Sequence, residues 1–344
     1  MTLQSINTNP YLSTIIKFCY FFKLKIIIIG GGISGCSCAH LLLLAGHEVM
    51  VLEKGRGVGG RMATRRMEGA RIDHGAQFFT ARDDRLQRLN QRWIKEERVV
   101  PWYDQVPGRT DLPTDMRYRG KSGMTGPAKS LTQGCSLALN FFVEKIEQGN
   151  GWKVYERGRE LRVLNADHLV VTIPSLQMLE LFERSNLDLG TDAMTGLRKI
   201  RHTCCLALLG ILDRPSRLLH PGAVTHPADH IDWLSDNQIK GISERPAMTL
   251  HASPRFSERN WEIPAEDWAP DLIGAAQDVL GAQVITSVSH RWGFAKPIQT
   301  FGATHYHQPE IGLTLAGDGF GGERVEGACV SGMEAAGAIL GSQS

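Results

Sequence analysis

KIIIIGGGISGCSCAHLLLLAGHEVMVLE, residues 25–53, is the stretch that decides the fold. Lys25–Ile29 is a β-branched run that ends in glycine, which is typical of a buried parallel strand. Ile33–Ala45 is rich in Leu and Ala and predicts a helix with Gly46 as its C-cap, and Glu48–Glu53 predicts a second strand. Such β-α-β crossovers are almost always right-handed. The stretch therefore predicts an α/β fold built on a Rossmann-like domain.

The turn between the first strand and the helix has the pattern GxGxxG. Gly30 permits the tight turn, Gly32 lets the backbone approach a diphosphate, and Gly35 lets helix and strand pack closely. The helix start at Ile33 and Ser34 then offers free N–H groups to phosphate. Glu53 ends the next strand 23 residues after Gly30, where its carboxylate is expected to bind an adenosine ribose. The alternative is a plain glycine turn with a solvated Glu.

A second glycine turn follows Glu53 at once: Lys54-Gly55-Arg56-Gly57-Val58-Gly59-Gly60-Arg61-Met62. NAD domains generally lack it, whereas flavoproteins of the amine-oxidase type carry this ExxxxxGGR pattern against the FAD diphosphate. Arg61 would then be the cation that pairs with phosphate, and Lys54, Gly60 and Met62 would contact the cofactor beside it. The alternative is a basic surface loop. The two turns together predict FAD rather than NAD.

A third motif lies near the C-terminus. Thr314–Asp318 is a short strand ending in Gly317-Asp318, and Arg324–Ala328 opens the last helix. Asp318 is expected to bind the ribityl chain, and the helix start at Val325 is expected to face the flavin pyrimidine edge. Two further predicted contacts, which could equally be plain strand residues, are the Thr172-x-Pro174 turn and the backbone of Val143 with Ile146.

Composition excludes several classes of function. The 344 residues carry a net charge of +2 with no basic stripe, so nucleic acid is not expected as a partner. Seven cysteines without a CxxC pair argue against zinc and disulfides and indicate a reducing, cytoplasmic location. Tyr11–Phe22 is apolar but is interrupted by Lys17 and is too short to span a bilayer, so membrane insertion is not expected. No motif indicates an oligomeric state.

The rest of the chain predicts a β-rich substrate domain inserted into the FAD-binding domain. Residues 1–24 are interpreted as an N-terminal extension, with disorder, a membrane-touching segment or a docked helix left open. We assign residues 25–105, 136–180 and 301–344 to the FAD-binding domain and 106–135 and 181–300 to the substrate domain. The predicted helices and strands include 83–100, Val100–Tyr103, Met116–Arg119, Leu137–Phe142, Trp152–Tyr155, His168–Ile173, Ser175–Arg184, His202–Leu212, Met248–Ala252, Asp271–Leu280, Thr286–Trp292, Leu313–Ala316 and Ala328–Leu340.

Several blocks together resemble the renalase family, especially its bacterial members. The specific block is Asp73-His74-Gly75-Ala76-Gln77-Phe78-Phe79-Thr80-Ala81-Arg82; the others are Arg56–Met62, Gly120–Met124, Asp232-Trp233-Leu234, His290-Arg291-Trp292, Ala295-Lys296-Pro297, Gly317-Asp318, Arg324–Ala328 and Ser331-Gly332. The likeness runs from about Lys25 to Leu340. The sequence departs from the family pattern at Lys296, where arginine is expected, and around Gly317–Gly322, where Phe320 replaces a Trp-Cys pair.

The resemblance implies a function. Renalases hold FAD noncovalently and oxidise the 2- and 6-dihydro isomers of nicotinamide dinucleotides, with bacterial members mainly restricted to the 2-dihydro isomer; a hydride passes to flavin N5, and O₂ then reoxidises the flavin to give hydrogen peroxide. Gly75, Ala76, Gln77, Phe78 and Phe79 are expected to lie beside the isoalloxazine, with Gln77 and Phe79 towards the substrate. Trp292 and Arg324 would also line that pocket.

The chemistry expected there needs no metal and no acid–base triad, because a dihydropyridine aromatises as it gives up hydride. Lys296 is either a residue that contacts flavin N5 through water or a surface or phosphate-facing lysine. His74 and His290 are expected to be core or turn residues rather than acid–base groups. The alternative functions are an FAD-dependent amine oxidase or desaturase, and a non-enzymatic role in which FAD is structural.

Overall fold

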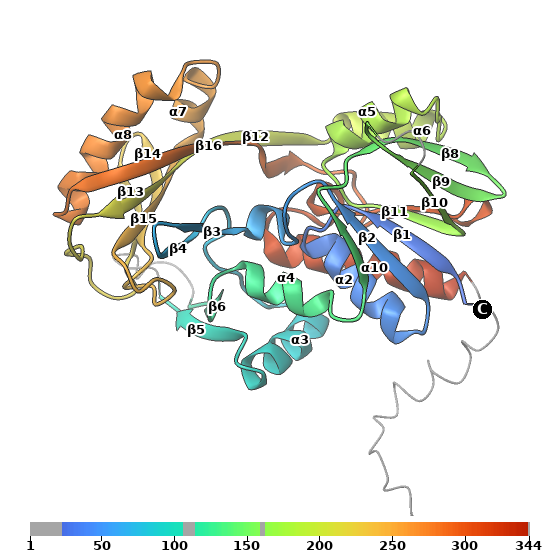
Figure 1. The fold of residues 1–344 in the computed structure, drawn as a ribbon, viewed down its shortest axis with the longest axis horizontal. Coiled ribbons are helices and arrows are strands. Elements are labelled where there is room, and N and C mark those ends of the chain that lie inside the picture. The colour runs from blue at the N-terminus through green and yellow to red at the C-terminus, as the bar shows by residue number, and fades with distance from the viewer. Residues whose placement is uncertain (1–22, 106–113, 159–161, 343–344) are drawn as a thin grey trace, which may run out of the picture.

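The computed structural model describes residues 23–105, 114–158 and 162–342. Residues 1–22 of the predicted N-terminal extension, including its apolar stretch, lie outside the described residues. The described chain forms two lobes joined by the long strands β12 (Arg201–Leu212) and β16 (Val284–Gln299), as Figure 1 shows.

The first lobe is built on a sheet with the strand order β17-β18-β11-β1-β2-β7. The central strands run parallel, and only β17 is antiparallel to its neighbour. The bounds are β1 Lys25–Ile29, β2 Glu48–Glu53, β7 Ser136–Leu139, β11 His168–Val171, β17 Tyr306–Gln308 and β18 Leu313–Leu315. A parallel sheet of this kind has its ligand-binding edge at the carboxyl ends of the strands.

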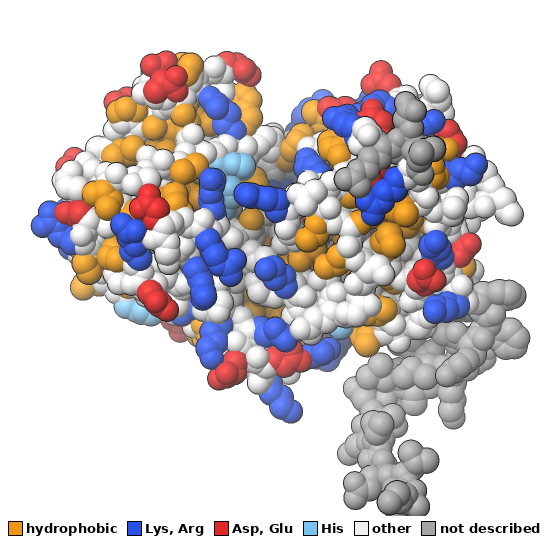
Figure 2. All heavy atoms as spheres, viewed as in Figure 1, with side chains coloured by type: hydrophobic (Ala, Val, Ile, Leu, Met, Phe, Trp, Pro, Cys, Tyr) orange, Lys and Arg blue, Asp and Glu red, His pale blue; other side chains and the backbone are white. Residues whose placement is uncertain are grey.

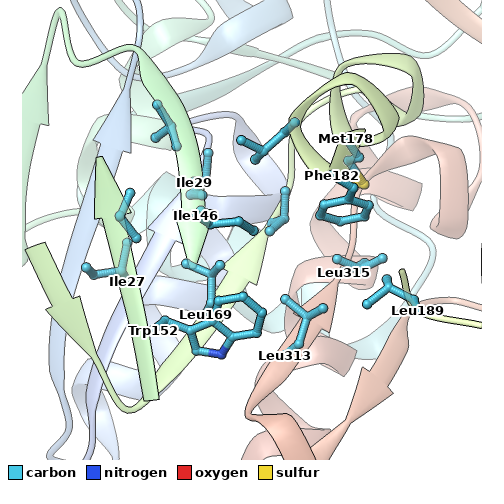
Figure 3. Packing of buried hydrophobic residues seen from close by; sticks show 14 of the residues in the cluster. Ile27, Ile29, Ile146, Trp152, Leu169, Met178, Phe182, Leu189, Leu313 and Leu315 are labelled. Atoms are coloured by element: carbon cyan, nitrogen blue, oxygen red, sulfur yellow. The ribbon is translucent and has the colours of Figure 1, made fainter. Parts of the chain in front are cut away.

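Both faces of this sheet are covered, which explains why β1 is apolar throughout. Ile26 and Ile28 pack against helices α2 (Ile33–Leu44) and α10 (Arg324–Gly341). Ile27 and Ile29 point to the opposite face, where Trp152 and Phe182 lie in the same cluster (Figure 3). That face is covered by β8 (Val143–Gly149), β9 (Gly151–Glu156), β10 (Val163–Ala166), α5 (Ser175–Arg184) and α6 (Thr191–Lys199). Successive residues of a strand alternate between faces, so only an unbroken apolar run fits here.

The second lobe is an antiparallel sheet in the order β13-β14-β15-β12-β16. The remaining bounds are β13 Ala223–Ala228, β14 Ile231–Asp236 and β15 Ala247–Ala252, with helices α7 Pro254–Arg259 and α8 Ala265–Leu280. Trp268 and Leu272 of α8 pack on Leu208 and Leu250 of the sheet, and all four are at most 1% exposed. This arrangement confirms the predicted fold class, an α/β Rossmann-like domain with a β-rich second domain.

Two hairpins and two helices lie in the middle and along the lower side of the molecule as drawn in Figure 1. They are β3 (Thr64–Met67) with β4 (Ala70–Asp73), β5 (Val99–Tyr103) with β6 (Arg117–Gly120), α3 (Asp84–Lys95) and α4 (Thr125–Leu131). Ala70 and Ile72 of β4 pack on Leu209 and Ile211 of the second lobe. The hairpin β3–β4 therefore extends from the second glycine turn into the substrate-side lobe.

Several element bounds differ from those that the sequence predicts. Helix α3 ends at Lys95, α8 begins at Ala265 instead of Asp271, and α10 begins at Arg324 instead of Ala328. The early start of α8 includes Pro270 inside the helix, a residue that sequence rules treat as a helix boundary. Helix α6 and the β3–β4 hairpin have no counterpart among the predicted elements.

The packing also places two predicted domain boundaries differently. Phe182, Leu189 and Leu197 belong to the same buried cluster as β1, so the chain leaves the first lobe near Ile200 rather than at residue 181. Likewise Ala128 and Leu131 of α4 pack with Ile33 of α2, whereas the sequence predicts that 106–135 belongs to the substrate domain. Within the described residues, no helix is both long and apolar enough to cross a membrane.

The contact between α2 and α10 generates a test of the fold. A Cβ at Gly332 would lie 2.0 Å from the Ser34 carbonyl oxygen, whereas a Cβ at Gly337, in the same helix, would meet nothing within 4 Å. Gly332→Ala is expected to lower the free energy of unfolding by at least about 1–3 kcal/mol through overpacking. Gly337→Ala is expected to raise it by about 0.5–1 kcal/mol, because glycine is a poor helix former. Urea unfolding measures both, and equal effects of the two substitutions would contradict this packing.

Candidate functional site

The first glycine turn lies where β1 ends, beside the end of β11. The Gly30 N–H donates to the Leu52 carbonyl at 2.8 Å, and Thr172 Oγ1 donates to the Gly30 carbonyl at 2.9 Å. A Cβ on Gly35 would lie 2.0 Å from the Gly30 oxygen. Gly35 is thus required by the close approach of helix and turn, as the motif predicts.

The second glycine turn contacts the first one directly. The Gly59 N–H donates to the Gly31 carbonyl at 2.7 Å, and Gly32 and Gly59 pair as an isolated parallel bridge. Gly59 and Gly60 both have positive φ, at +117° and +53°, a region that favours glycine. Two turns separated by some 30 residues of sequence therefore form one backbone surface.

The start of α2 within this surface fits a diphosphate. Its N-cap residue is Gly32, no side chain caps the helix, and a Cβ at Gly32 would meet nothing within 4 Å. The Ser34 hydroxyl is buried and has no hydrogen-bond partner. Buried polar groups normally find partners, so an orphan hydroxyl beside uncapped helix N–H groups indicates a missing acceptor such as phosphate. Ile33 packs behind this turn in the core with Met62.

Glu53 holds the two turns together. Its Oε2 accepts from the Gly31 N–H at 2.8 Å, and its Oε1 accepts from the Gly55 N–H at 2.6 Å. The neighbouring Lys54 Nζ lies 3.3 Å from Gln177 Oε1 on the surface. The ribose contact predicted for Glu53 would have to use the remaining acceptor capacity of this carboxylate.

Arg61 and Asp318, predicted to contact phosphate and ribityl, lie against each other. The guanidinium makes a bidentate pair with the carboxylate at 2.5 and 2.6 Å and also donates to the Phe294 carbonyl at 2.8 Å. His202 Nε2 lies 3.4 Å from the same carboxylate. Burial alone would raise the pKa of Asp318, but contact with His202 and the hydrogen bonds from Arg61 outweigh it and hold the pKa below its ordinary value.

The start of α10 carries local backbone strain. Arg324 has φ +83°, in the left-handed region that a residue with a side chain rarely adopts. Its neighbour Glu323 accepts from Lys296 Nζ at 2.6 Å, and Arg324 Nε lies 3.8 Å from Glu323. The side chains of Lys296 and Arg324 are more than half exposed, so both are available to an incoming anion. Val325 follows in the first turn of α10 and is buried.

The Gly75 loop lies against the second glycine turn. The Ala76 N–H donates to the Arg61 carbonyl at 2.8 Å, and a Cβ on Gly75 would lie 2.2 Å from that carbonyl oxygen. The Trp292 ring borders the same place, 3.3 Å from that Cβ position, and its centroid is 4.7 Å from that of His74. Trp292 Nε1 and His74 Nε2 are buried without a partner. The Gly75 loop, the backbone of Arg61 and the Trp292 ring thus lie together.

Gln77 and Phe79, which the sequence predicts to lie towards the substrate, are instead buried. Gln77 is 5% exposed; its Nε2 donates to the Asp73 and Gly75 carbonyls, and its Oε1 accepts from Ser235 and Lys240. Its carboxamide therefore has no hydrogen-bonding capacity left for a substrate. Phe79 is 2% exposed and packs in the core, and Phe78 packs against three other rings, Trp102, Tyr103 and Trp233.

The remaining residues that the sequence predicts to contact the cofactor lie at or next to the ends of strands. Thr172 caps the Gly30 turn through its hydroxyl, Pro174 is the N-cap of α5, and Val143 is the buried first residue of β8. No group of three or more metal-ligating side chains occurs among the residues that the structure describes. Sequence reasoning missed Lys240, which lies alone in a polar turn with no surrounding motif.

Comparison with known proteins agrees with this geometry. Residues 28–93 match the family model for an NAD(P)-binding Rossmann-like domain. The chain is 50% identical over 142 residues to an L-amino-acid oxidase of Sistrurus catenatus edwardsii, covering 37% of this chain and 26% of that protein. It is 48% identical over 195 residues to an L-amino-acid oxidase of Crotalus adamanteus, covering 50% and 33%. The chain thus spans a third or less of the length of these relatives.

A solved structure extends the likeness to nearly the whole chain. Cyclohexylamine oxidase from Brevibacterium oxydans IH-35A superposes with a TM-score of 0.72, covering 93% of this chain and 99% of the other, at 14% sequence identity. At that identity the likeness shows the fold, which is the amine oxidase fold.

The histidine beside the loop gives a pH prediction. Burial, His290 and Arg65 lower the pKa of His74 to about 3. An unfolded histidine titrates near 6.5, so between about pH 6.5 and 3 the unfolded chain binds a proton that the folded chain does not, and stability falls as the pH is lowered through this window. His74→Gln is expected to make that fall shallower by up to about 1.4 kcal/mol per pH unit. Urea unfolding across the window, with the exposed His230→Gln as control, measures it; an unchanged slope in His74→Gln would refute the assignment.

Proposed function

Because the chain has the fold of the flavin-dependent amine oxidase superfamily and shares sequence with its members, we propose that it is an FAD-dependent oxidase of a dihydronicotinamide dinucleotide. The observation that carries the flavin assignment is the joined pair of glycine turns, with the orphan Ser34 hydroxyl at the start of α2. FAD, when bound, would accept a hydride at flavin N5 and pass the electrons to O₂, giving hydrogen peroxide.

The chain's own groups would bind the cofactor noncovalently from several sides. The main-chain N–H groups of Gly32, Ile33 and Ser34 would bind the diphosphate, and Gly30 and Gly35 would let it approach. Arg61 ends the second glycine turn, and Asp318 pairs with it from the segment that follows β18. The second turn with Arg61 favours FAD over NAD, since it provides a second flank for the diphosphate.

Charge around the site supports an anionic substrate. Lys296 and Arg324 are exposed beside Glu323. The positive charge of Arg65 contributes, after burial, to the lowered pKa of both His74 and His290. Figure 2 shows Lys and Arg side chains gathered over the middle of the molecule, between the lobes. Such a field attracts a phosphate-bearing dinucleotide and repels a protonated amine. The resemblance to renalase over Asp73–Arg82 supports the same substrate class.

The proposed role of the protein in the reaction is to position the donor ring and exclude water. His74 is neutral at pH 7 because its pKa is lowered to about 3 by burial and its neighbours, so it supplies no cation to the donor ring. A dihydropyridine needs no base, because it loses hydride and becomes aromatic. Trp292, beside the Gly75 loop, would close one side of the ring site.

Amine or amino-acid oxidation is the second candidate, and one finding favours it. The matched relatives named above are L-amino-acid oxidases, at 48–50% identity over their aligned segments. In that case Arg324 would pair with the substrate carboxylate, and the hydride would come from the carbon that bears the amine.

Anaerobic rapid mixing separates the two candidates. The FAD-loaded protein is expected to lose its yellow absorption on mixing with 2-dihydroNAD within seconds, and to show no such loss with L-amino acids or alkyl amines. Bleaching by an amino acid or an amine alone would replace the first proposal by the second. Absence of bleaching by every donor, with dithionite still effective, would contradict both.

Lys296 allows a separate prediction about charge. As an exposed residue paired with Glu323, it is expected to attract the substrate rather than take part in the hydride step. Lys296→Met should raise KM for 2-dihydroNAD by a factor of about 2 to 5, the effect of one exposed charge, with little change in the reduction rate at saturation. Lys121→Met, which removes another exposed, ion-paired lysine, is the matched control. A large loss of the saturated rate would instead support a water-bridged contact with flavin N5.

A further inference from the structure

Lys240 is a fully buried lysine between the lobes. It lies in the turn that joins β14 to β15, and its side chain is 0% exposed. Its Nζ donates to Asp73 Oδ2 at 2.6 Å and to Gln77 Oε1 at 3.1 Å, and it lies 4.9 Å from the centre of the Trp102 ring. The three N–H bonds of the ammonium group thus have a carboxylate, a carboxamide and an aromatic face as partners.

Asp73 is equally enclosed. Its side chain is 0% exposed, and its Oδ1 accepts from Thr64 Oγ1 at 2.7 Å and from the Met124 N–H at 2.8 Å. Its carbonyl accepts from Gln77 Nε2 at 2.8 Å and from Thr249 Oγ1 at 2.9 Å. This carboxylate is therefore bound by Thr64 of β3, by the backbone just before α4 and by Lys240 of the second lobe.

Gln77 connects this ion pair to the cofactor turn. The Gln77 carboxamide oxygen accepts from Lys240 and Ser235, and the carboxamide nitrogen donates to the Gly75 carbonyl at 3.0 Å. The next residue, Ala76, donates its N–H to the Arg61 carbonyl. The path from Lys240 to the second glycine turn thus passes through only Gln77 and the Gly75–Ala76 backbone.

We propose that Lys240 is a positioning residue, which holds the Gln77 carboxamide and thereby fixes the Gly75–Ala76 backbone against the second glycine turn. This inference rests on the proposed function for the identity of the bound group, FAD. It assigns Gln77 the role of a clamp on the loop, in place of a substrate contact.

A purely stabilising role is the competing explanation. Burying two charges costs desolvation that their attraction barely repays, so a buried ion pair adds little stability over apolar side chains, whereas removal of one partner is strongly destabilising. The two explanations therefore differ in a variant that removes both charges. If the pair only stabilises the fold, removing both charges should leave the backbone of the Gly75 loop as ordered as in the wild type. If the pair positions the loop, removing both charges should loosen that backbone.

The test uses the double variant K240M/D73N, with K240M alone as the single-charge case. Lys145→Met, which removes an exposed, ion-paired lysine far from this network, is the control. Hydrogen–deuterium exchange of peptides covering 74–79 is measured in the FAD-free protein, and the FAD dissociation constant is measured by titration. Thermal unfolding reports whether each variant is folded.

We expect the double variant to melt close to the wild type, with amide exchange in 74–79 and the FAD dissociation constant both raised at least about tenfold. Gln77→Leu should reproduce both effects, and adding K240M/D73N to it should change neither further. A folded double variant with wild-type exchange and wild-type FAD affinity would overturn the proposal. If the wild type bound no FAD, the proposed function would fail, while the exchange data would still decide whether Lys240 positions the loop.

Discussion

The contact between two glycine turns is the constraint on which the rest of the structure depends. The Gly59 N–H donates to the Gly31 carbonyl, and Gly32 lies beside Gly59 as a parallel bridge. Glu53 accepts from the backbone on both sides and fixes the distance between the turns. The helix α2, the strand β2 and the Gly75 loop are all placed relative to this backbone surface, because each is bonded to one of its two turns.

Two polar joints tie the second lobe to this surface. Arg61 connects the second glycine turn to Asp318 and to the Phe294 carbonyl of β16. Lys240 reaches from the β14–β15 turn to Asp73 and Gln77. Both joints converge on the Gly75–Ala76 backbone, so the candidate site is set by both lobes together.

The sequence predicted what local patterns determine. The β1-α2-β2 unit and the need for glycine at Gly35 follow from short-range periodicity and close packing, and the structure confirms the fold class. The sequence could not predict where the side chains of Gln77 and Phe79 point, because the orientation of side chains in an irregular loop depends on tertiary partners. Lys240 could not be predicted for the same reason: its carboxylate partner Asp73 is 167 residues away, and no motif surrounds Lys240 itself.

The most direct measurement is FAD titration of the wild type and Gly32→Val, with thermal unfolding of each. Gly32 has φ −71°, and an added Cβ would meet nothing within 4 Å, so the variant should fold and melt like the wild type. The wild type is expected to bind FAD one to one, and Gly32→Val to bind at least about tenfold more weakly, since its side chain would stand where the diphosphate approaches the backbone. Equal FAD affinity in a folded Gly32→Val variant, or no binding by the wild type, would contradict the account.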